Sequence, residues 1–293
     1  MEKLDGPAPM GHEYVGTVEE VGADVRTIRP GRFVIGSFWA SDGTCELCRA
    51  GYQSSCVHRV LMGSIGTQSE LARIPLADGT LVATPERPRR TWCRACWPRP
   101  TCSAPAGSAP SRRTSRPARP SRSSGTAPSA CAGVLAARRL GAERIVAMSR
   151  HAPRQELARR FGATDIVTER GADGVAEIKD MTGGLGAHSV IEAVGTSESM
   201  LQAIRSTRPG GHVGFVGVSH DVRLPVEELF FSQVHLHGGP APVRRFLPEL
   251  IELIWNREID PGAVFDLALP LEEAAEGYRA MDERRAIKTL LNP

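Results

Sequence analysis

The sequence has no run of apolar residues long enough to cross a bilayer, and its first residues lack the pattern of a signal peptide. Its seven cysteines are an odd number without a secretory context, which argues against a disulfide framework and favours thiolates that bind metal. A length of 293 residues with 41% hydrophobic composition allows two domains with ordinary cores. We therefore expect a cytoplasmic protein that has no membrane partner.

One segment lacks almost every residue type that builds a core. Positions 87–133 contain no Val, Leu, Ile, Met, Phe or Tyr, and no Asp, Glu or Lys. Such a segment cannot bury enough apolar surface to offset its ordering entropy, which predicts disorder. It holds ten arginines, so the formal net charge of +3 becomes −7 for the rest of the chain (+3 − 10). The arginines are Arg87, Arg89, Arg90, Arg94, Arg99, Arg112, Arg113, Arg116, Arg119 and Arg122.

Two interpretations of this segment are open. The first is a basic arm that binds nucleic acid or an acidic membrane. Its only aromatic residues for stacking on bases are Trp92 and Trp97, which argues against a nucleic-acid partner. The second interpretation is a local error of the reading frame in a GC-rich gene, entered near Arg87 and corrected near Gly133.

The second interpretation can be tested on the residues themselves. Read one base earlier with GC-rich codons, residues 123–131 become Val-Val-Gly-Asp-Gly-Ala-Val-Gly-Leu, a strand end followed by a Gly-x-Gly-x-x-Gly loop. The same shift turns residues 91–98 into Asp-Leu-Val-Pro-Gly-Leu-Leu-Ala, the start of an apolar helix. On this hypothesis Cys93 and Cys96 are out-of-frame residues and not a metal or redox pair.

A metal-ligand spacing lies nearer the amino terminus. Cys45, Cys48 and Cys56 follow one another within a glycine-punctuated loop, which is how a chain surrounds a tetrahedral zinc ion. A closed structural site needs four ligands, and Asp42 stands three residues before the first cysteine. A carboxylate oxygen is an acceptable zinc ligand. The spacing therefore predicts a zinc loop with Asp42 as the fourth ligand.

The Gly11-His12-Glu13 motif precedes this loop, and alternating residues after Tyr14 indicate barrel strands. Together with the cysteine loop, these residues resemble the zinc-containing alcohol dehydrogenases of the medium-chain dehydrogenase/reductase family. The resemblance covers Leu4–Glu86 and Val134–Pro293. It implies an α/β protein: an incomplete GroES-like β-barrel catalytic domain and a Rossmann domain with a doubly wound parallel sheet. The expected division is 1–86, the aberrant segment 87–133, the Rossmann domain 134–255 and a return segment 256–293.

The resemblance also implies metal ligands and a reaction. In the family, the histidine of the Gly-His-Glu motif binds a catalytic zinc and the glutamate lies beside it, which maps to His12 and Glu13. The cysteine loop binds a second, structural zinc through Cys45, Cys48 and Cys56, with Asp42 in place of the usual first cysteine. The reaction is hydride transfer between an alcohol or carbonyl substrate and a nicotinamide cofactor, with zinc as the Lewis acid. Relatives are dimers or tetramers, so a homo-oligomer is expected.

The expected cofactor is NADP. The strand that ends near Ala147 is followed by Ser149 and Arg150, which can bind a 2′-phosphate, whereas NAD is usually recognised by an acid there. The phosphate loop is altered, because Gly125 is present but Ala127 and Ala130 stand where the second and third glycines belong. Further cofactor contacts are implied by the resemblance at Gly195, Gly217, Val218, Gly239 and Lys288.

Two expected catalytic-zinc ligands have no counterpart in this sequence. The family has a cysteine ahead of the Gly-His-Glu motif, where this chain has only Met1–Ala8, and a third ligand that is not recognisable here. Either the sequence starts at an internal methionine or part of the zinc site is missing. We expect weak or no activity. The alternatives are a catalytically dead relative that retains zinc or nucleotide binding, and a basic interaction protein.

Overall fold

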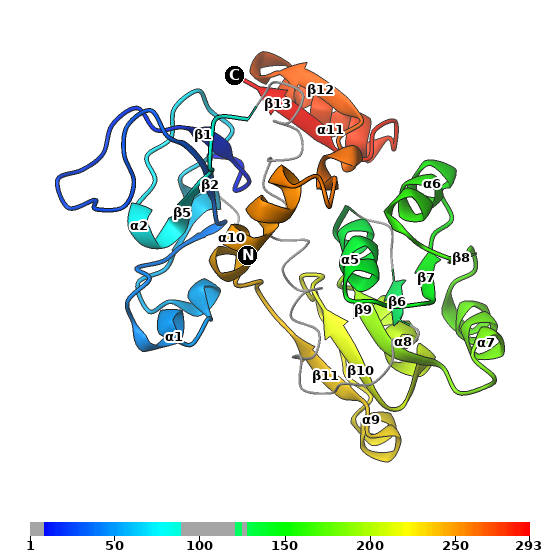
Figure 1. Cartoon of the computed structure of the whole chain (residues 1–293). Coiled ribbons are helices and arrows are strands. Elements are labelled where there is room, and N and C mark those ends of the chain that lie inside the picture. Colours follow the sequence, from blue (N-terminus) through cyan, green and yellow to red (C-terminus); the bar gives the residue numbers. More distant parts are fainter. Residues whose placement is uncertain (1–8, 89–120, 125–127) are drawn as a thin grey trace. The chain divides into compact units, whose positions relative to one another are not determined.

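A computed structural model of the chain describes residues 9–88, 121–124 and 128–293 (Figure 1). The chain divides into two compact units, Met1–Pro100 with Pro242–Pro293, and Thr101–Ala241. Contacts group helix α10 (Val243–Trp255) with the first unit, so this division differs from the expected one, in which the Rossmann domain runs through residue 255. The expected domain bounds stay a prediction.

The first unit is built from short strands. Its larger sheet is antiparallel, in the order β1-β2-β5, and two further strand pairs complete it. The strands are β1 (Val15–Thr17), β2 (Phe33–Gly36), β3 (Trp39–Ala40), β4 (Val60–Leu61), β5 (Leu81–Ala83), β12 (Leu267–Pro270) and β13 (Thr289–Asn292). β3 pairs with β4 in antiparallel fashion, and β12 with β13 in parallel.

The core of the first unit lies on the β1-β2-β5 sheet. Tyr14, Val34 and Leu81 are buried there with Met62. Burial raises the pKa of the Tyr14 phenol, whose hydroxyl donates to the Ser37 carbonyl oxygen at 3.4 Å. The helices of this unit are α1 (Glu46–Arg49), α2 (Ala77–Thr80), α10 and α11 (Ala274–Asp282), with 3₁₀ turns at Gln53–Ser55, Met62–Ser64, Pro261–Val264 and Leu271–Glu273.

Asp78 on α2 holds the loop that enters β2. Its carboxylate accepts hydrogen bonds from the backbone N–H of Arg26 at 2.9 Å and of Thr27 at 2.8 Å, and from the Thr27 hydroxyl. These bonds, the Thr27 hydroxyl first, lower the pKa of Asp78 to about 2. Asp78 therefore stabilises the fold in its ionised form.

We expect D78N to lower the free energy of unfolding at neutral pH by about 1 kcal/mol, because the amide binds these donors less well. A carboxyl with a depressed folded-state pKa contributes fully above its unfolded value near 4 and loses the contribution as pH falls towards 2. In urea titrations the gap between the two proteins should hold down to about pH 5 and shrink by roughly half at pH 3. The stabilising role of Asp78 would be refuted if the difference in unfolding free energy did not change with pH. It would also be refuted if D24N, at an exposed site, gave an equal difference.

The second unit contains a six-stranded sheet in the order β11-β10-β9-β6-β7-β8, and every neighbouring pair is parallel. The chain runs from β6 through β7 to β8 on one side, then crosses to β9 and continues to β11 on the other. The direction of winding therefore reverses between β6 and β9. The strands are β6 (Ser121–Ser124), β7 (Ile145–Met148), β8 (Asp165–Val167), β9 (Ala187–Glu192), β10 (Thr207–Phe215) and β11 (His235–Gly238).

Helices connect these strands and cover the sheet. Figure 1 shows α5 and α6 together on one side of the sheet and α7 with α8 on the other. Local signals in the sequence explain the helix ends: Gly162 ends α6 with a φ of 110°, and the Thr196 side chain caps α8 by accepting from Ser199 N. The helices are α5 (Pro128–Arg139), α6 (Ala152–Phe161), α7 (Gly171–Met181), α8 (Ser197–Ser206) and α9 (Val226–Ser232).

The structure differs from the sequence-based expectation at the end of the arginine-rich segment. Disorder was expected through Gly133, yet Ser121–Ser124 forms a strand between β7 and β9, and α5 begins at Pro128. Ala130 and Cys131 are buried. The backbone pairing of β6 with two apolar strands outweighs the poor local composition. The rest of the segment, including Cys93 and Cys96, lies outside the described residues.

Among the described residues, none of the helices is long and apolar enough to cross a membrane.

Candidate zinc and nucleotide sites

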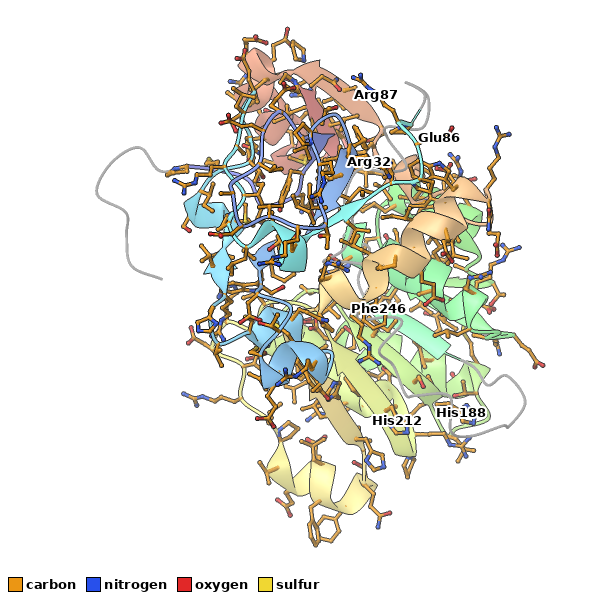
Figure 2. All side chains as sticks on the ribbon, turned by 60° about the vertical axis from the view of Figure 1, so that its left-hand side comes forward. Arg32, Glu86, Arg87, His188, His212 and Phe246 are labelled. Carbon is orange, nitrogen blue, oxygen red and sulfur yellow. The ribbon has the colours of Figure 1, made fainter. Side chains whose placement is uncertain are left out.

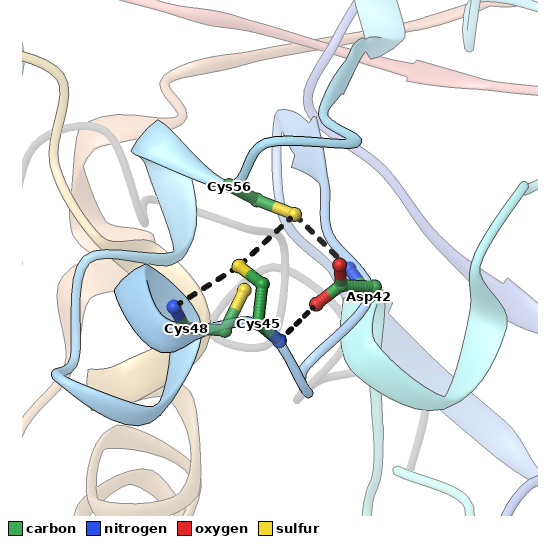
Figure 3. Close-up of side chains that lie close together, drawn as sticks. All are labelled: Asp42, Cys45, Cys48 and Cys56. Atoms are coloured by element: carbon green, nitrogen blue, oxygen red, sulfur yellow. Dashed lines mark hydrogen bonds between the residues drawn. The ribbon is translucent and has the colours of Figure 1, made fainter.

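Four predicted zinc ligands lie together in the first unit. One ligand atom each from Asp42, Cys45, Cys48 and Cys56 lies within 4.8 Å of the other three (Figure 3). Zn–S bonds of about 2.3 Å in a tetrahedron place two sulfurs about 3.8 Å apart. The Cys45 and Cys56 Sγ atoms are 3.9 Å apart. The donor set and spacing therefore fit a tetrahedral zinc ion.

Local structure brings the four side chains together. Cys45 caps α1, which places Cys48 one turn later on the same side, and the 3₁₀ turn at Gln53–Ser55 returns the chain to Cys56. Backbone N–H groups point at the sulfurs: Asp42 N and His58 N each lie 3.4 Å from Cys56 Sγ. Such donors stabilise a thiolate more than a thiol.

The thiols of this cluster have unequal pKa values. N–H groups of Val57 and Cys48 lower the pKa of Cys45, whereas burial, followed by the neighbouring thiols, raises the pKa of Cys48. Three thiols at this spacing resist joint ionisation without a cation, because their negative charges repel one another. A bound divalent zinc would lower the pKa of all three thiols, since thiols that coordinate zinc lose their protons.

Asp42 is the most constrained ligand. Its Oδ1 accepts from Thr44 N at 2.7 Å and from Cys45 N at 2.9 Å, and its Oδ2 lies 2.7 Å from His58 Nδ1. These contacts, the Cys45 N–H first, hold the pKa of Asp42 well below its usual range. The sequence pattern identified Asp42 but not His58, because a histidine two residues after the last cysteine is not part of a zinc spacing.

The Gly-His-Glu motif is not part of the four-residue zinc cluster. His12 is exposed, and its ring lies 6.0 Å from the ring of Phe38. The Glu13 carboxylate forms an ion pair with Lys288 Nζ, which also lies 5.8 Å from the Phe265 ring. Within residues 9–88, 121–124 and 128–293, the sets of three or more metal-ligating side chains do not include His12. The roles of His12 and Glu13 in catalysis, and of Lys288 at a cofactor phosphate, stay predictions.

The second unit offers a nucleotide site where its winding reverses. In open α/β sheets, ligands bind beyond the carboxyl ends of the strands at such a switch point. Here these ends are Ser124 of β6 and Glu192 of β9, which are paired in register. Gly195 and Gly217 follow β9 and β10 at the same edge. A Cβ atom on Gly195 would lie 2.1 Å from the Val218 carbonyl oxygen, so only glycine allows the two backbones to approach this closely.

Glu192 organises the turn after β9 and was not identified from the sequence. It is fully buried, and its Oε1 accepts from Val194 N at 2.7 Å, Gly195 N at 2.9 Å and Ser199 Oγ at 2.8 Å. Its Oε2 has no hydrogen-bond partner among the described residues. A glutamate at the end of an apolar strand looks like an exposed strand end in a sequence, since its partners come from a turn that the pattern does not predict.

The expected 2′-phosphate residues differ in accessibility. Ser149 is buried and its hydroxyl oxygen accepts from His151 N at 3.1 Å, whereas Arg150 is exposed immediately after β7. Arg150 is therefore the candidate that remains free to meet a ligand. Val218 is 74% exposed, and Gly239 has a φ of 133° beyond β11. Gly125 lies outside the described residues, so its cofactor contact stays a prediction.

Three histidines of the second unit, His188, His212 and His235, lie on strands before the strand ends at the switch point. Figure 2 shows His188 and His212 at the lower end of the sheet, and His188 Nε2 lies 2.6 Å from Arg208 Nη1. His212 stacks on His235 of the neighbouring strand with ring centroids 4.7 Å apart. Burial, followed by the charge of His235, lowers the pKa of His212. His212 is in register with Ser189, three positions before the pair formed by Phe215 and Glu192.

Comparisons with known proteins agree with both units. A zinc-binding dehydrogenase family model matches residues 130–256, and an alcohol dehydrogenase GroES-like domain model matches residues 1–86. The chain is 33% identical to a probable zinc-binding alcohol dehydrogenase of Mycobacterium tuberculosis, over 93% of this chain and 71% of the relative. It is 29% identical to zinc-type alcohol dehydrogenase B of Aspergillus flavus, over 96% and 68%.

Solved structures give the same result. The structure of an alcohol dehydrogenase from Thermus sp. ATN1 matches with a TM-score of 0.85 and 29% identity, over 97% of this chain and 84% of that one. The predicted fold, a GroES-like domain with a Rossmann domain, is thereby confirmed. The chain belongs to the zinc-containing alcohol dehydrogenases of the medium-chain dehydrogenase/reductase family, which are oxidoreductases.

Proposed function

We propose that the chain is an NADP-preferring alcohol dehydrogenase whose structural zinc is held by Asp42, Cys45, Cys48 and Cys56, and whose catalysis is impaired. The observation that carries the zinc assignment is the tetrahedral spacing of these four donors. The substrate is an alcohol or a carbonyl compound, as in the family. A zinc ion at the reacting centre would supply a Lewis acid for the substrate oxygen, and the nicotinamide would carry the hydride.

The preference for NADP is supported by the charge beyond β7. The residues there are Ser149, Arg150 and His151, with no acid to accept from a ribose 2′-hydroxyl. Because the Ser149 hydroxyl already binds the backbone, the exposed Arg150 guanidinium is the group that we assign to the 2′-phosphate. One protein of similar structure is an NAD-dependent alcohol dehydrogenase and another, a zinc-binding dehydrogenase of Sinorhizobium meliloti, is bound to NADP, so both cofactors occur on this fold.

We expect R150A to raise the Kd for NADPH by about 10- to 100-fold, which corresponds to the loss of a charge-assisted hydrogen bond. The Kd for NADH should stay unchanged, because that cofactor has no 2′-phosphate. Titrations that follow the fluorescence of the reduced nicotinamide measure both constants. R159A on the exposed side of α6 is the matched control. An equal loss of affinity for both cofactors in R150A would contradict the assignment of Arg150 to the 2′-phosphate. Tighter binding of NADH than of NADPH by the unaltered chain would contradict it as well.

Impaired cofactor binding is supported by the altered phosphate loop. The chain has Ala127 and Ala130 at the second and third glycine positions, and Ala130 is buried in α5. The second glycine allows the backbone to approach a pyrophosphate, and the third allows the helix to approach the strand. In addition, His12 lacks partner ligands among the described residues. Weak binding and weak turnover are the expected result.

The register of β6 supports the frame-shift hypothesis. Arg122 stands in register between Val146 and Val190, which are both buried. A central strand of a parallel sheet is buried on both faces and is normally a run of Val, Ile and Leu. The shifted frame replaces Ser123 and Ser124 with two valines, which suits this position. We propose that the natural protein carries the shifted residues.

We further propose that the protein is a homo-oligomer, with a second copy against α9 and β11. Phe230 and Phe231 of α9 are each 75% exposed, and Val226 is 71% exposed. β11 is the edge strand of the described sheet, so one row of its backbone N–H and C=O groups is unpaired there. An identical edge from a second copy would pair with it and cover the phenylalanines.

The compartment that we propose is the cytoplasm, because Cys45, Cys48, Cys56 and Cys131 form no disulfide with one another and a reducing environment keeps cysteines in that state. The hypothesis of a basic interaction protein depends on arginines that mostly lie outside the described residues. No observation on the described residues favours it.

A further inference from the structure

We propose that His58 positions Asp42 as the fourth ligand of the zinc loop, a role that rests on the proposed zinc site. The observation is the 2.7 Å contact between His58 Nδ1 and Asp42 Oδ2, while Thr44 N and Cys45 N hold the other oxygen, Oδ1. His58 does not take part in coordination itself. It fixes the orientation of the one ligand that is not a thiol.

The lone pairs of Asp42 show why orientation matters. A carboxylate offers about four lone-pair sites. Thr44 N and Cys45 N occupy two of these at Oδ1, and His58 Nδ1 occupies one at Oδ2. A single site is left, on Oδ2. One oxygen of this carboxylate lies within 4.8 Å of the three sulfurs.

A carboxylate needs such support more than a cysteine does. The side chain of Asp42 can rotate about its last bond, whereas a thiolate presents one sulfur from one position. Zinc accepts both thiolate and carboxylate ligands. An unrestrained carboxylate loses rotational freedom on coordination, and this entropy loss weakens zinc binding. Partners that hold a ligand typically change metal affinity by about 10- to 100-fold when they are removed.

Two features separate the histidine side chain from the rest of the loop. The His58 backbone N–H lies 3.4 Å from Cys56 Sγ and is retained in any substitution except proline. The His58 side chain is 70% exposed, while that of Asp42 is 12% exposed. A substitution at His58 therefore removes the contact with Asp42 without opening the core or changing the thiol donors.

The test is zinc affinity, measured on the full chain by competition with a chromogenic chelator. We expect H58A to raise the Kd for zinc by about 10- to 100-fold and H58N to recover most of the loss, because the asparagine amide can donate where Nδ1 does. H220A, at an exposed histidine in the other unit, should leave the Kd unchanged. Cobalt(II) in place of zinc should give the same visible spectrum in the unaltered chain and in H58N, since both keep three thiolates and one carboxylate.

Three outcomes would overturn the inference. An H58A protein with the Kd of the unaltered chain would show that Asp42 needs no positioning. A cobalt spectrum that changes in H58N but not in D42N would make His58 the ligand and Asp42 its partner. A chain that binds no zinc at all would overturn both this inference and the proposed zinc site, whereas the first two outcomes leave the zinc site standing.

Discussion

Replacing Cys56 with alanine is expected to reduce the zinc content of the purified protein from about one ion per chain to nearly none. Cys56 is completely buried, and its sulfur accepts from Asp42 N and His58 N, so it is the donor most enclosed by the loop. With three donors left, a structural site loses both a bond and its closed tetrahedral shell. Elemental analysis of protein that has been passed over a chelating resin measures the effect.

The same substitution should destabilise the first unit. Structural zinc contributes on the order of 10 kcal/mol of apparent binding free energy, and part of it stabilises the folded loop. The midpoint of thermal unfolding should fall by several degrees, and chelator should produce the same fall in the unaltered chain. C131A is the matched control, because Cys131 is a buried cysteine of the second unit. Full zinc content in C56A, or a chelator effect of equal size in C56A, would contradict the zinc loop.

The second large effect is expected at the α9 and β11 surface. The double variant F230E/F231E should convert the oligomer to a monomer in light scattering at micromolar concentration. Burial of a phenylalanine contributes about 1.5–3 kcal/mol, and a symmetric contact buries two from each copy. Four buried glutamates in their place would add the cost of desolvating their charges. The expected weakening of association therefore exceeds a thousandfold.

This prediction has a simple control in the other unit. Leu71 is 76% exposed there, so L71E adds a charge to the surface without touching α9. Its mass in solution should equal that of the unaltered protein. A monomeric unaltered chain, or an F230E/F231E protein that keeps the mass of the oligomer, would refute the proposed contact.

Local sequence patterns predicted the features that are formed by residues close together in the sequence. The zinc loop runs over 15 residues, Asp42 to Cys56, and all four donors lie together as the spacing indicated. The end of helix α6 likewise has a local cause, because Gly162 follows it in the left-handed conformation. The strand order, by contrast, follows from pairing between distant segments, and the resemblance to a family implied only a doubly wound parallel sheet.

Contacts between distant residues escaped sequence analysis. The ion pair of Glu13 with Lys288 joins positions 275 residues apart. The sequence analysis placed Glu13 beside a catalytic zinc and Lys288 at the cofactor, and so did not pair them. Glu192 was not selected because its three donors come from one turn and one helix start. β6 was missed for a different reason: Ser121–Ser124 has the composition of a loop, and only its two neighbours make it a strand.

The most direct test of an impaired nucleotide site compares NADPH affinity before and after residues 123–131 are replaced by Val-Val-Gly-Asp-Gly-Ala-Val-Gly-Leu. The replacement restores two glycines, and so the backbone approach that allows N–H groups to bind the pyrophosphate. One charge-assisted hydrogen bond gained corresponds to about 1.5–3 kcal/mol, or roughly 10- to 150-fold in Kd. The control S123V/S124V restores only the apolar strand and should recover less.

Fluorescence titration of NADPH into the three proteins gives this comparison without any assay of turnover. Our account predicts the tightest binding for the nine-residue replacement, at least tenfold tighter than for the unaltered chain. Equal affinity in all three proteins would contradict it, because the phosphate loop as it stands would then be sufficient for the cofactor.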